Sequence, residues 1–362
     1  MHIERLEAVR FRNLAPLALE LTAAPVVLVG DNAQGKTNLL EGLALCATGR
    51  SFRHARPEEL IRHGEPGARL AARFVRAGVR HDVEVELAPR HRGLRVDGRH
   101  VRQSTSLLEL VNVVSFFPDD LRIAKGSPEE RRRFLDRAIA NHRPDFVAAA
   151  LAYAKALKSR NALVRAPTPP ERRLLEVFDE ELVRYGALVH ACRSETLQAL
   201  APLATARFAD IMRAESRLEL ELASGAPGEG AFGEQLRAAL ARSYARDRSR
   251  GMTTVGPHRA DLLMRVGGRD ARTFASQGQQ RAIVLALKLA ELEYLKGRLG
   301  AAPILLLDDV SSELDPERTR AFFAAVAALE SQVWVSTTGA AALPLPGSAQ
   351  VLRVRDGRLD RD

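Results

Sequence analysis

The stretch Gly30-Asp31-Asn32-Ala33-Gln34-Gly35-Lys36-Thr37 matches the P-loop pattern G-x-x-x-x-G-K-[ST] at every fixed position. Glycines at positions 30 and 35 permit backbone angles that a Cβ atom would block. The N–H groups of such a loop point at the β-phosphate of a nucleotide, assisted by the N-terminus of the following helix. The required context is present, because an apolar run at 26–29 predicts a strand before the loop and residues 39–47 predict a helix after it.

A second element, Ile304-Leu305-Leu306-Leu307-Asp308-Asp309, has the form of the acidic strand that accompanies a P-loop. Apolar runs that end in an acid are common, so this pattern indicates a nucleotide site only in combination with the P-loop. In such a pair Lys36 reaches the β- and γ-phosphates of ATP, and Mg²⁺ is held by Thr37 and, through water, by Asp308. The next acid, Asp309, can orient the attacking water. We therefore predict Lys36, Asp308 and Asp309 as the catalytic residues.

The spacing of the two motifs predicts the domain organisation. About 270 residues separate Lys36 from Asp308, and small P-loop enzymes usually keep the motifs closer. The intervening chain is mostly helical in pattern from Ser127 to about Tyr244, whereas both chain ends read as α/β. We expect an ATPase lobe built from residues 1–115 plus 255–362, with an inserted, mainly helical lobe of residues 116–254.

Hydrophobic periodicity predicts the individual elements. Alternating patterns predict strands at 3–9, 17–21 and 218–222, and a β-meander over 69–101. Amphipathic patterns predict helices at 148–163, 170–198, 232–248 and 279–296. Short apolar runs predict buried strands at 304–307 and 332–336, and an Asp-Pro pair predicts that residues 315–329 form a helix.

Two further segments resemble parts of ABC-type ATPases. Ser276-Gln277-Gly278-Gln279-Gln280-Arg281 lies about 30 residues ahead of Asp308 and is similar to their signature loop, in which a serine and a helix N-terminus meet the γ-phosphate held by the other subunit. The alternative is an ordinary serine N-cap. Ser311-Ser312-Glu313-Leu314-Asp315 is similar to the D-loop at the dimer interface, and its alternative is also a plain N-cap segment.

Taken together, the motifs resemble the RecF family of bacterial DNA repair ATPases. The ordered matches run through almost the whole chain and are more specific than any single motif. They are Phe11-Arg12-Asn13, Gly30–Asn38 with Leu39-Leu40-Glu41, Ser51-Phe52-Arg53, Phe117-Pro118-Asp119-Asp120-Leu121, Lys125-Gly126-Ser127-Pro128, Arg131-Arg132-Arg133-Phe134-Leu135-Asp136, Gly256-Pro257-His258-Arg259, Ala275–Arg281, Leu306–Val310 and Ser312–Asp315.

The resemblance implies an ABC/SMC (Rad50-like) P-loop head without a long coiled coil. It also implies an ATP-dependent homodimer that clamps double-stranded or gapped DNA and is opened by hydrolysis. In the family this serves recombinational repair of single-strand gaps, with RecO and RecR helping to load RecA, and it supports replication restart and the SOS response. The implied ATP-binding residues are Arg12, Asn13, Gly30, Asp31, Asn32, Ala33, Gln34, Gly35, Lys36, Thr37, Asn38, Ser276, Gly278 and Gln279.

Three positions depart from the wider ABC pattern. Asp309 stands where many relatives have glutamate, and its shorter arm predicts slow turnover. No histidine follows the strand at 332–336, where Thr337 and Thr338 stand instead. No glutamine is identified for a Q-loop, and Asp119 or Asp120 is the substitute that the sequence offers.

Bulk composition agrees with a soluble cytoplasmic protein. Hydrophobic residues make up 46% of the chain, enough for a sizeable core, and no apolar run is long enough to span a membrane. The two cysteines, Cys46 and Cys192, have no metal-ligand spacing, which favours a reducing compartment. The N-terminus lacks the apolar region of a signal peptide.

Net charge is +9, which favours a polyanionic partner, although a high-arginine genome gives the same balance. Three segments are basic: residues 50–102 and 116–173 each hold 13 Lys/Arg against 7 Asp/Glu, and residues 237–259 hold 6 against 1. Only 5% of residues are aromatic, so contact with a duplex backbone is favoured over stacking on single strands. Two alternatives remain open here: an ATPase subunit of an ABC transporter and a small-molecule P-loop kinase.

Overall fold

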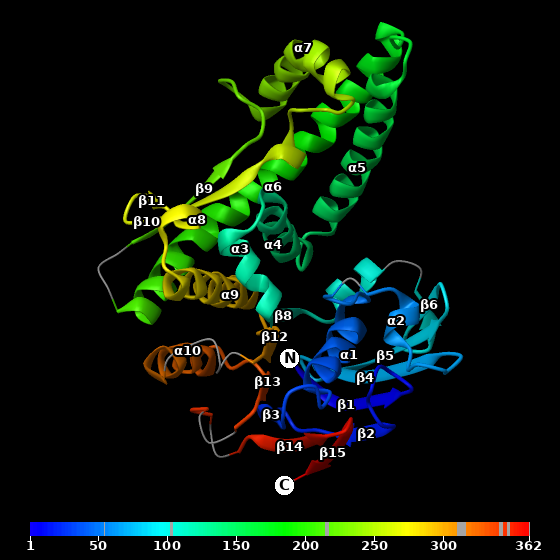
Figure 1. Ribbon diagram of the computed structural model, residues 1–362, viewed down its shortest axis with the longest axis vertical. Coiled ribbons are helices and arrows are strands. Elements are labelled where there is room, and N and C mark those ends of the chain that lie inside the picture. Colours follow the sequence, from blue (N-terminus) through cyan, green and yellow to red (C-terminus); the bar gives the residue numbers. More distant parts are fainter. Residues whose placement is uncertain are drawn as a thin grey trace. The chain divides into compact units, whose positions relative to one another are not determined.

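The computed structural model describes residues 1–53, 55–101, 104–213, 217–309, 316–339, 343–345 and 348–361. They form two compact units. Unit 1 contains Met1–Leu121, Ala206–Glu215 and Ser276–Asp362, and unit 2 contains Arg122–Thr205 and Ser216–Ala275. In unit 1 the two ends of the chain meet, drawn in blue and red in Figure 1, as the spacing of the two phosphate-site motifs predicts.

Unit 1 is built around a six-stranded sheet of order β15-β14-β3-β13-β12-β8. The strands are β3 (Val26–Val29), β8 (Val113–Phe116), β12 (Ile304–Asp308), β13 (Val333–Thr337), β14 (Gln350–Arg355) and β15 (Arg358–Arg361). All neighbours are parallel except the β14–β15 hairpin. Strands β12 and β13 are buried at every position, which explains their unbroken apolar runs.

A second sheet of unit 1 is antiparallel, with the order β2-β1-β4-β5-β6-β7. Its strands are β1 (His2–Val9), β2 (Leu17–Glu20), β4 (Ala68–Arg76), β5 (Val79–Ala88), β6 (His91–Val96) and β7 (Arg99–His100), so the predicted meander is confirmed. Helix α1 (Lys36–Thr48) contacts strands of both sheets. Its side chains share one apolar core with them, and ten of its residues are buried.

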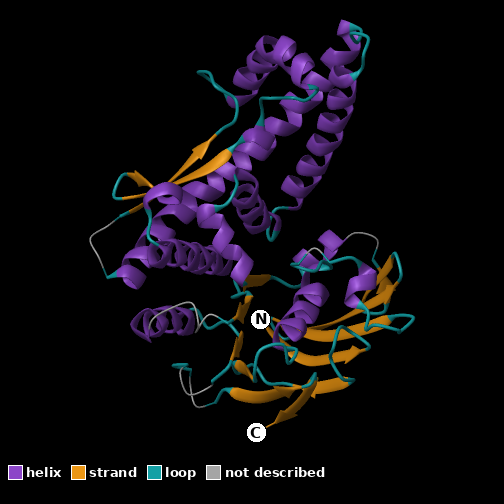
Figure 2. Ribbon diagram, in the orientation of Figure 1, coloured by secondary structure: helices purple, strands orange, loops and turns teal. Residues whose placement is uncertain are grey.

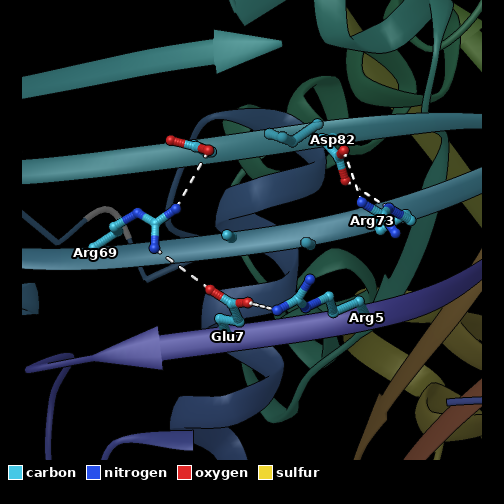
Figure 3. A pocket seen from close by; sticks show the side chains of 9 residues that line it. Arg5, Glu7, Arg69, Arg73 and Asp82 are labelled. Carbon is cyan, nitrogen blue, oxygen red and sulfur yellow. Dashed lines mark hydrogen bonds and ion pairs between the residues drawn. The ribbon is translucent and has the colours of Figure 1, made fainter. Parts of the chain in front are cut away.

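One face of the antiparallel sheet carries paired charges. A hollow of about 140 Å³ lies on this face, lined by residues of β1, β4 and β5. Figure 3 shows the side chains that line it. Arg69 reaches both Glu7 and Glu84, and Arg73 pairs with Asp82 at 2.8 Å. The cations and carboxylates compensate one another, so this hollow has no excess charge to attract a ligand.

The other elements of unit 1 are α2 (Pro57–Leu60), the 3-10 helices η1 (Ser104–Glu109) and η2 (Pro118–Leu121), and the helices α9 (Gln277–Leu299) and α10 (Pro316–Ala328). Helix α9 contacts β8, η2 and α10. Its ends follow from sequence, because Ser276 caps its N-terminus and Gly300, at φ 68°, ends it in the left-handed conformation.

Unit 2 is mainly helical (Figure 2). It contains α3 (Arg122–Lys125), α4 (Pro128–Ala140), α5 (Pro144–Arg165), most of α6 (Arg172–Met212), α7 (Phe232–Arg250), η3 (Pro257–Arg259) and α8 (Ala271–Phe274). A three-stranded antiparallel sheet of order β11-β10-β9 completes it, from β9 (Leu218–Ala223), β10 (Asp261–Val266) and β11 (Arg269–Asp270).

The compact units are divided differently from the predicted lobes. Residues 255–275, expected with the ATPase lobe, lie in unit 2. The reason is that β10 pairs along its whole length with β9, and Asp261 at its start accepts two hydrogen bonds from Arg131 of α4. The functional division into an ATPase lobe and a helical lobe stays a prediction.

Most predicted elements are confirmed to within a few residues at their ends. Helix α6 continues to Met212, beyond the predicted end at residue 198. Elements for which no range was predicted include α4, the strands β8 and β10, and the β14–β15 hairpin, which adds two strands to the parallel sheet. Among the residues that the structure describes, no helix has the length and apolar character needed to cross a membrane.

Candidate nucleotide-binding site

The predicted phosphate-site residues meet at one edge of the parallel sheet. The P-loop follows β3, Asp308 ends β12, Thr337 ends β13 and η2 follows β8. Because these strands are parallel neighbours, their carboxyl ends lie side by side. Open parallel sheets bind ligands at this edge.

The two glycines of the P-loop are needed for different reasons. Gly35 caps α1 at φ 115°, a left-handed conformation that favours glycine. Gly30 is absent from the glycines with positive φ, so the predicted need for an unusual backbone angle is wrong at this position. A Cβ atom on Gly30 would instead stand 2.2 Å from the carbonyl oxygen of Val354 on β14. Close packing of two backbones therefore requires glycine there.

The Lys36 side chain turns back over the P-loop. Its Nζ donates hydrogen bonds to the carbonyl oxygens of Gly30 at 2.5 Å and Asp31 at 2.7 Å. Only 7% of the residue is exposed, and this burial lowers the pKa of the amine, an effect opposed by the nearby carboxylates of Asp309, Asp308 and Asp31. The cation thus lies inside the loop, where a phosphate group offers oxygen acceptors of the same kind.

Thr37 and Asp308 are brought together as the sequence predicts. Thr37 Oγ1 donates a hydrogen bond to Asp308 Oδ1 at 3.0 Å. The same carboxylate oxygen accepts a second hydrogen bond from Ser336 Oγ, at 2.6 Å. Ser336 Oγ also accepts from the backbone N–H of Asp309, whose φ of 53° turns the chain sharply after β12. Ser336 therefore fixes both acids of the pair.

This arrangement fits Mg²⁺ bound together with a nucleotide. A threonine hydroxyl and a carboxylate are hard oxygen ligands, and protein Mg²⁺ sites commonly use one or two carboxylates plus substrate phosphates. The described residues contain no group of three or more His, Cys, Asp or Glu side chains that would form an all-protein cage. Thr37 and Asp308 are thus the residues that could hold the ion.

Arg12, predicted to bind ATP, is held by a buried carboxylate. Glu41 on α1 is fully buried, and Arg12 donates to its two oxygens at 3.0 and 3.1 Å. Ser51 Oγ donates to the same carboxylate at 2.6 Å, and Arg53 lies 3.5 Å from it. Three segments that resemble the RecF family, around residues 12, 41 and 52, therefore converge on the side chain of Glu41.

Asn13 and Asn38 connect this cluster to the P-loop. Arg53 Nη1 donates to Asn38 Oδ1 at 3.0 Å, and Asn38 Nδ2 donates to Asn13 Oδ1 at 2.8 Å. Asn13 Nδ2 in turn donates to the carbonyl of Ala33 at 3.4 Å. Asn13 therefore contacts the loop directly and Asn38 contacts Asn13, and the predicted contact of both with ATP stays a prediction.

Ser276, Gly278 and Gln279 lie at the start of α9. Ser276 Oγ accepts from Gln279 N, and Gln279 Oε1 accepts from Ser276 N, which forms a capping box. The N-cap alternative is thus correct, and it does not exclude a signature role because Ser276 is exposed. Within the described part of the chain, neither Ser276 nor Gln279 has a hydrogen bond to the P-loop.

Other predicted residues have varied placements. The D-loop segment, residues 311–315, lies outside the described residues. Asp120 Oδ2 accepts from Phe117 N at the start of η2, and its carboxylate lies 3.8 Å from the buried amine of Lys288. Asp119 is exposed, and Thr337 is buried at the end of β13.

Two features of the site, Ser336 and the turn Asp356-Gly357, were not predicted from the sequence. Ser336 stands opposite Asp308 in the β12–β13 register. Asp356 N donates to Gln34 Oε1 at 2.6 Å, and Gly357 N donates to Gln34 O at 2.9 Å. An Asp-Gly pair between alternating residues is a strong hairpin signal and could have identified the turn. Nothing local in the sequence marks Ser336.

In unit 2, the Gly-Pro-His-Arg segment forms a structural loop. His258 Nε2 donates to the carbonyl of Thr253 at 3.0 Å, so its Nδ1 accepts from the Tyr153 hydroxyl at 2.7 Å. Burial lowers the pKa of His258 to about 4. Arg132 donates to the carbonyl of Ala260, next to this loop. Both ring nitrogens of His258 thus have hydrogen-bond partners within the protein.

The comparisons with known proteins agree on one family. A protein-family model described as "RecF/RecN/SMC N terminal domain" matches residues 2–345. A protein of Myxococcus xanthus named "DNA replication and repair protein RecF" is 43% identical over 337 residues, which cover 91% of this chain and 88% of that one. A protein of the same name from Heliobacterium modesticaldum is 36% identical and covers 100% of this chain and 99% of its own.

Solved structures give the same result. A structure described as "the recombination mediator protein RecF-ATP in RecFOR pathway" has a TM-score of 0.91 at 31% identity and covers 99% of this chain and 97% of that one. An Smc head bound to the C-winged helix domain of ScpA has a TM-score of 0.60 at 16% identity, covering 100% and 97%. The second match shows the fold alone: an α/β head of the ABC/SMC kind.

Proposed function

The chain belongs to the RecF family, and on that premise we propose that it is an ATP-dependent DNA-binding clamp of DNA replication and repair. The observation that carries the proposal is the contact of Thr37 with Asp308 beside a complete P-loop. It supports Mg-ATP as the cofactor. The ATP-bound neighbour, at 31% identity over almost the whole chain, adds to that support.

The proposed chemistry is hydrolysis of ATP to ADP and phosphate. Lys36 would move from the carbonyls of its own loop to the β- and γ-phosphates, and the loop N–H groups would hold the β-phosphate. Thr37 and Asp308 would hold Mg²⁺, whose charge stabilises the phosphates as the bond to the γ-phosphate breaks. Asp309 would orient the attacking water, at a position fixed through its N–H by Ser336.

Dimerisation is proposed because, among the described residues, Ser276 and Gln279 bond to each other at the start of α9 and not to the P-loop of their own chain. Ser276 is exposed at a helix N-terminus, which attracts anions through its free N–H groups and dipole. A second chain could present this helix start to the γ-phosphate bound at Lys36. ATP would then be an interfacial ligand, and slow hydrolysis would open the dimer.

Duplex or gapped DNA is proposed as the partner on grounds of charge. Arg242, Arg246 and Arg250 stand at successive i, i+4 positions of α7, and all three are exposed. Arg246 donates to Thr254, and among the described residues none of the three pairs with a carboxylate. Such a row neutralises DNA phosphates without reading sequence.

The family's wider roles are extended to this chain as proposals. They are recombinational repair of single-strand gaps in the cytoplasm, cooperation with RecO- and RecR-type mediators in loading RecA, replication restart and the SOS response. Family membership favours these roles over a transporter ATPase or a small-molecule kinase.

A mass measurement by light scattering, with and without Mg-ATP, tests the dimer. We expect the mass to double with Mg-ATP, and Lys36→Met and Ser276→Arg each to prevent it. Loss of the serine cap costs helix stability of about 1 kcal/mol, so thermal unfolding of Ser276→Arg is the control.

Mixing the two variants makes the test sharper. A mixed dimer joins the intact Lys36 of one chain to the intact Ser276 of the other and so restores one composite site. Partial recovery of the ATP-dependent dimer is expected. No change of mass in the wild type, or no recovery in the mixture, would count against a shared site.

A further inference from the structure

The last hairpin of the chain closes with a two-residue turn that contacts the P-loop. Asp356 and Gly357, at φ 47° and 74°, connect β14 to β15 where Arg355 pairs with Arg358. Positive φ at both central residues is the geometry that favours Asp-Gly. Both N–H groups of this turn donate to Gln34, one to its side-chain oxygen and one to its carbonyl oxygen.

The turn is also fixed from its other side. The carbonyl oxygen of Gly357 accepts a hydrogen bond from the N–H of Ala15 at 2.8 Å. Gly357 is buried, and a Cβ atom there would stand 2.0 Å from the carbonyl oxygen of Asn13. The hairpin turn therefore lies between the segment 13–15 and the P-loop with no room for a side chain.

The hairpin thus contacts the P-loop at both ends of residues 31–34, the positions that the P-loop pattern leaves open. At the first end, Gly30 packs against the backbone of Val354 on β14. At the second end, the oxygens of Gln34 accept hydrogen bonds from both N–H groups of the turn. Residues 31–33 between these two contacts are exposed. The hairpin therefore fixes the positions of Gly30 and Gln34, on either side of the exposed residues.

We propose that Gln34 and the Asp356-Gly357 turn are positioning elements of the nucleotide site. They hold the P-loop in the shape in which its N–H groups converge, so that binding does not have to order the loop. This inference rests on the proposed nucleotide binding. It extends the site to residues 322 positions away in the chain, to a turn that the P-loop pattern does not include.

Two variants separate positioning from mere stability. Gln34→Met keeps the length of the side chain and removes the acceptor of the Asp356 N–H. Gly357→Ala places a methyl group against the Asn13 carbonyl. The control is Gly98→Ala in the turn Asp97-Gly98 between β6 and β7, which has φ values of 48° and 76°. A Cβ atom on Gly98 meets nothing within 4 Å, so the backbone strain is matched and the P-loop is untouched.

The experiment titrates each full-length variant with a fluorescent ATP analogue and Mg²⁺, without DNA, and records its thermal unfolding. Loss of one internal hydrogen bond, worth about 1 kcal/mol, predicts up to about fivefold weaker binding for Gln34→Met, together with a loss of stability of no more than that size. Gly357→Ala should weaken binding at least as much. Gly98→Ala should unfold earlier and bind like the wild type.

The outcomes distinguish the two proposals. Wild-type affinity in Gln34→Met, or in a folded Gly357→Ala, overturns the positioning role and leaves nucleotide binding intact. If Gly357→Ala does not fold, Gln34→Met decides alone. Failure of the wild type itself to bind the analogue overturns the proposed nucleotide binding, and the positioning role with it.

Discussion

The hydroxyl of Thr37 donates a hydrogen bond to Asp308 at 3.0 Å, across 271 positions of sequence. Thr37 lies in the first turn of α1, directly after the P-loop, and Asp308 is the last residue of β12. In the sheet, β13 lies between β12 and β3, the strand that precedes the P-loop. Their contact defines where a magnesium ion would be held between a hydroxyl and a carboxylate. It also shows why the chain needs both of its ends to make one site.

Ser336→Ala should weaken the binding of Mg²⁺ at the nucleotide site. The substitution removes the 2.6 Å hydrogen bond to Asp308 and the acceptor of the Asp309 N–H. Outer partners of metal ligands are typically worth tenfold or more in metal affinity. We expect half-saturation of ATP hydrolysis to need about tenfold more Mg²⁺.

The matched control for that experiment is Ser243→Ala in unit 2. Ser243 is also buried and also donates to a buried aspartate, Asp247, at 3.0 Å. This variant should lose stability and keep the wild-type magnesium dependence. If Ser336→Ala has the same magnesium dependence as the wild type, Ser336 contributes to stability alone.

Turnover of ATP should be slow. Asp309 has a shorter arm than glutamate, and its backbone is held by Ser336, so it reaches the attacking water less well. Steady-state phosphate release should stay below the rate of an ordinary enzyme, about 10 per second. Asp309→Asn should lower the rate further and leave nucleotide affinity unchanged. A wild-type rate well above that value would contradict the assignment.

Acid should destabilise unit 2 through His258. The ring is neutral in the fold, because burial lowers its pKa from 6.5 to about 4, and Arg259 and Arg132 add to the shift. Between those two pH values the unfolded chain binds a proton that the folded chain does not. Stability is therefore complete above pH 6.5, falls as the pH drops toward 4, and loses about 3 kcal/mol in total.

Urea unfolding measured from pH 7 to 4 checks this expectation. His258→Gln should flatten the pH dependence across that window, and replacement of the exposed His91 by Gln should leave it unchanged. An equally steep dependence in His258→Gln would assign the effect to other groups.

The arginine row of α7 should contribute to DNA affinity through salt-sensitive contacts. Each phosphate neutralised changes the slope of log K against log salt by about 0.9. Arg242→Gln with Arg246→Gln should therefore reduce the slope by about 2, equally for different sequences. The control is Arg172→Gln, an exposed arginine already paired with Glu176 at 2.9 Å. An unchanged slope in the double variant would exclude this row from the DNA interface.

The sequence could predict the elements of the site whose signals are local. The P-loop and the acidic strand each have fixed residues at fixed spacing, and the strand and helix beside them follow from hydrophobic periodicity. Their meeting at Thr37 and Asp308 followed from the roles of those motifs. The helices in the middle of the chain could also be predicted, because hydrophobic periodicity is a local signal.

Contacts set by strand pairing could not be predicted. Ser336 reaches Asp308 only because β13 lies beside β12 in a particular register. Gln34 meets Gly357 only because β14 pairs with β3, and the same pairing explains why Gly30 must be glycine. These are properties of the sheet order, and a single sequence has no local signal for that order.

The central claim is tested most directly by fluorescence anisotropy of a labelled gapped duplex, titrated with the protein over a salt series, with and without Mg-ATP. We predict tight binding only with Mg-ATP, a steep loss of affinity with salt, and no ATP-dependent binding by Lys36→Met. Equal affinity with and without Mg-ATP, or no binding in either condition, would contradict an ATP-gated clamp.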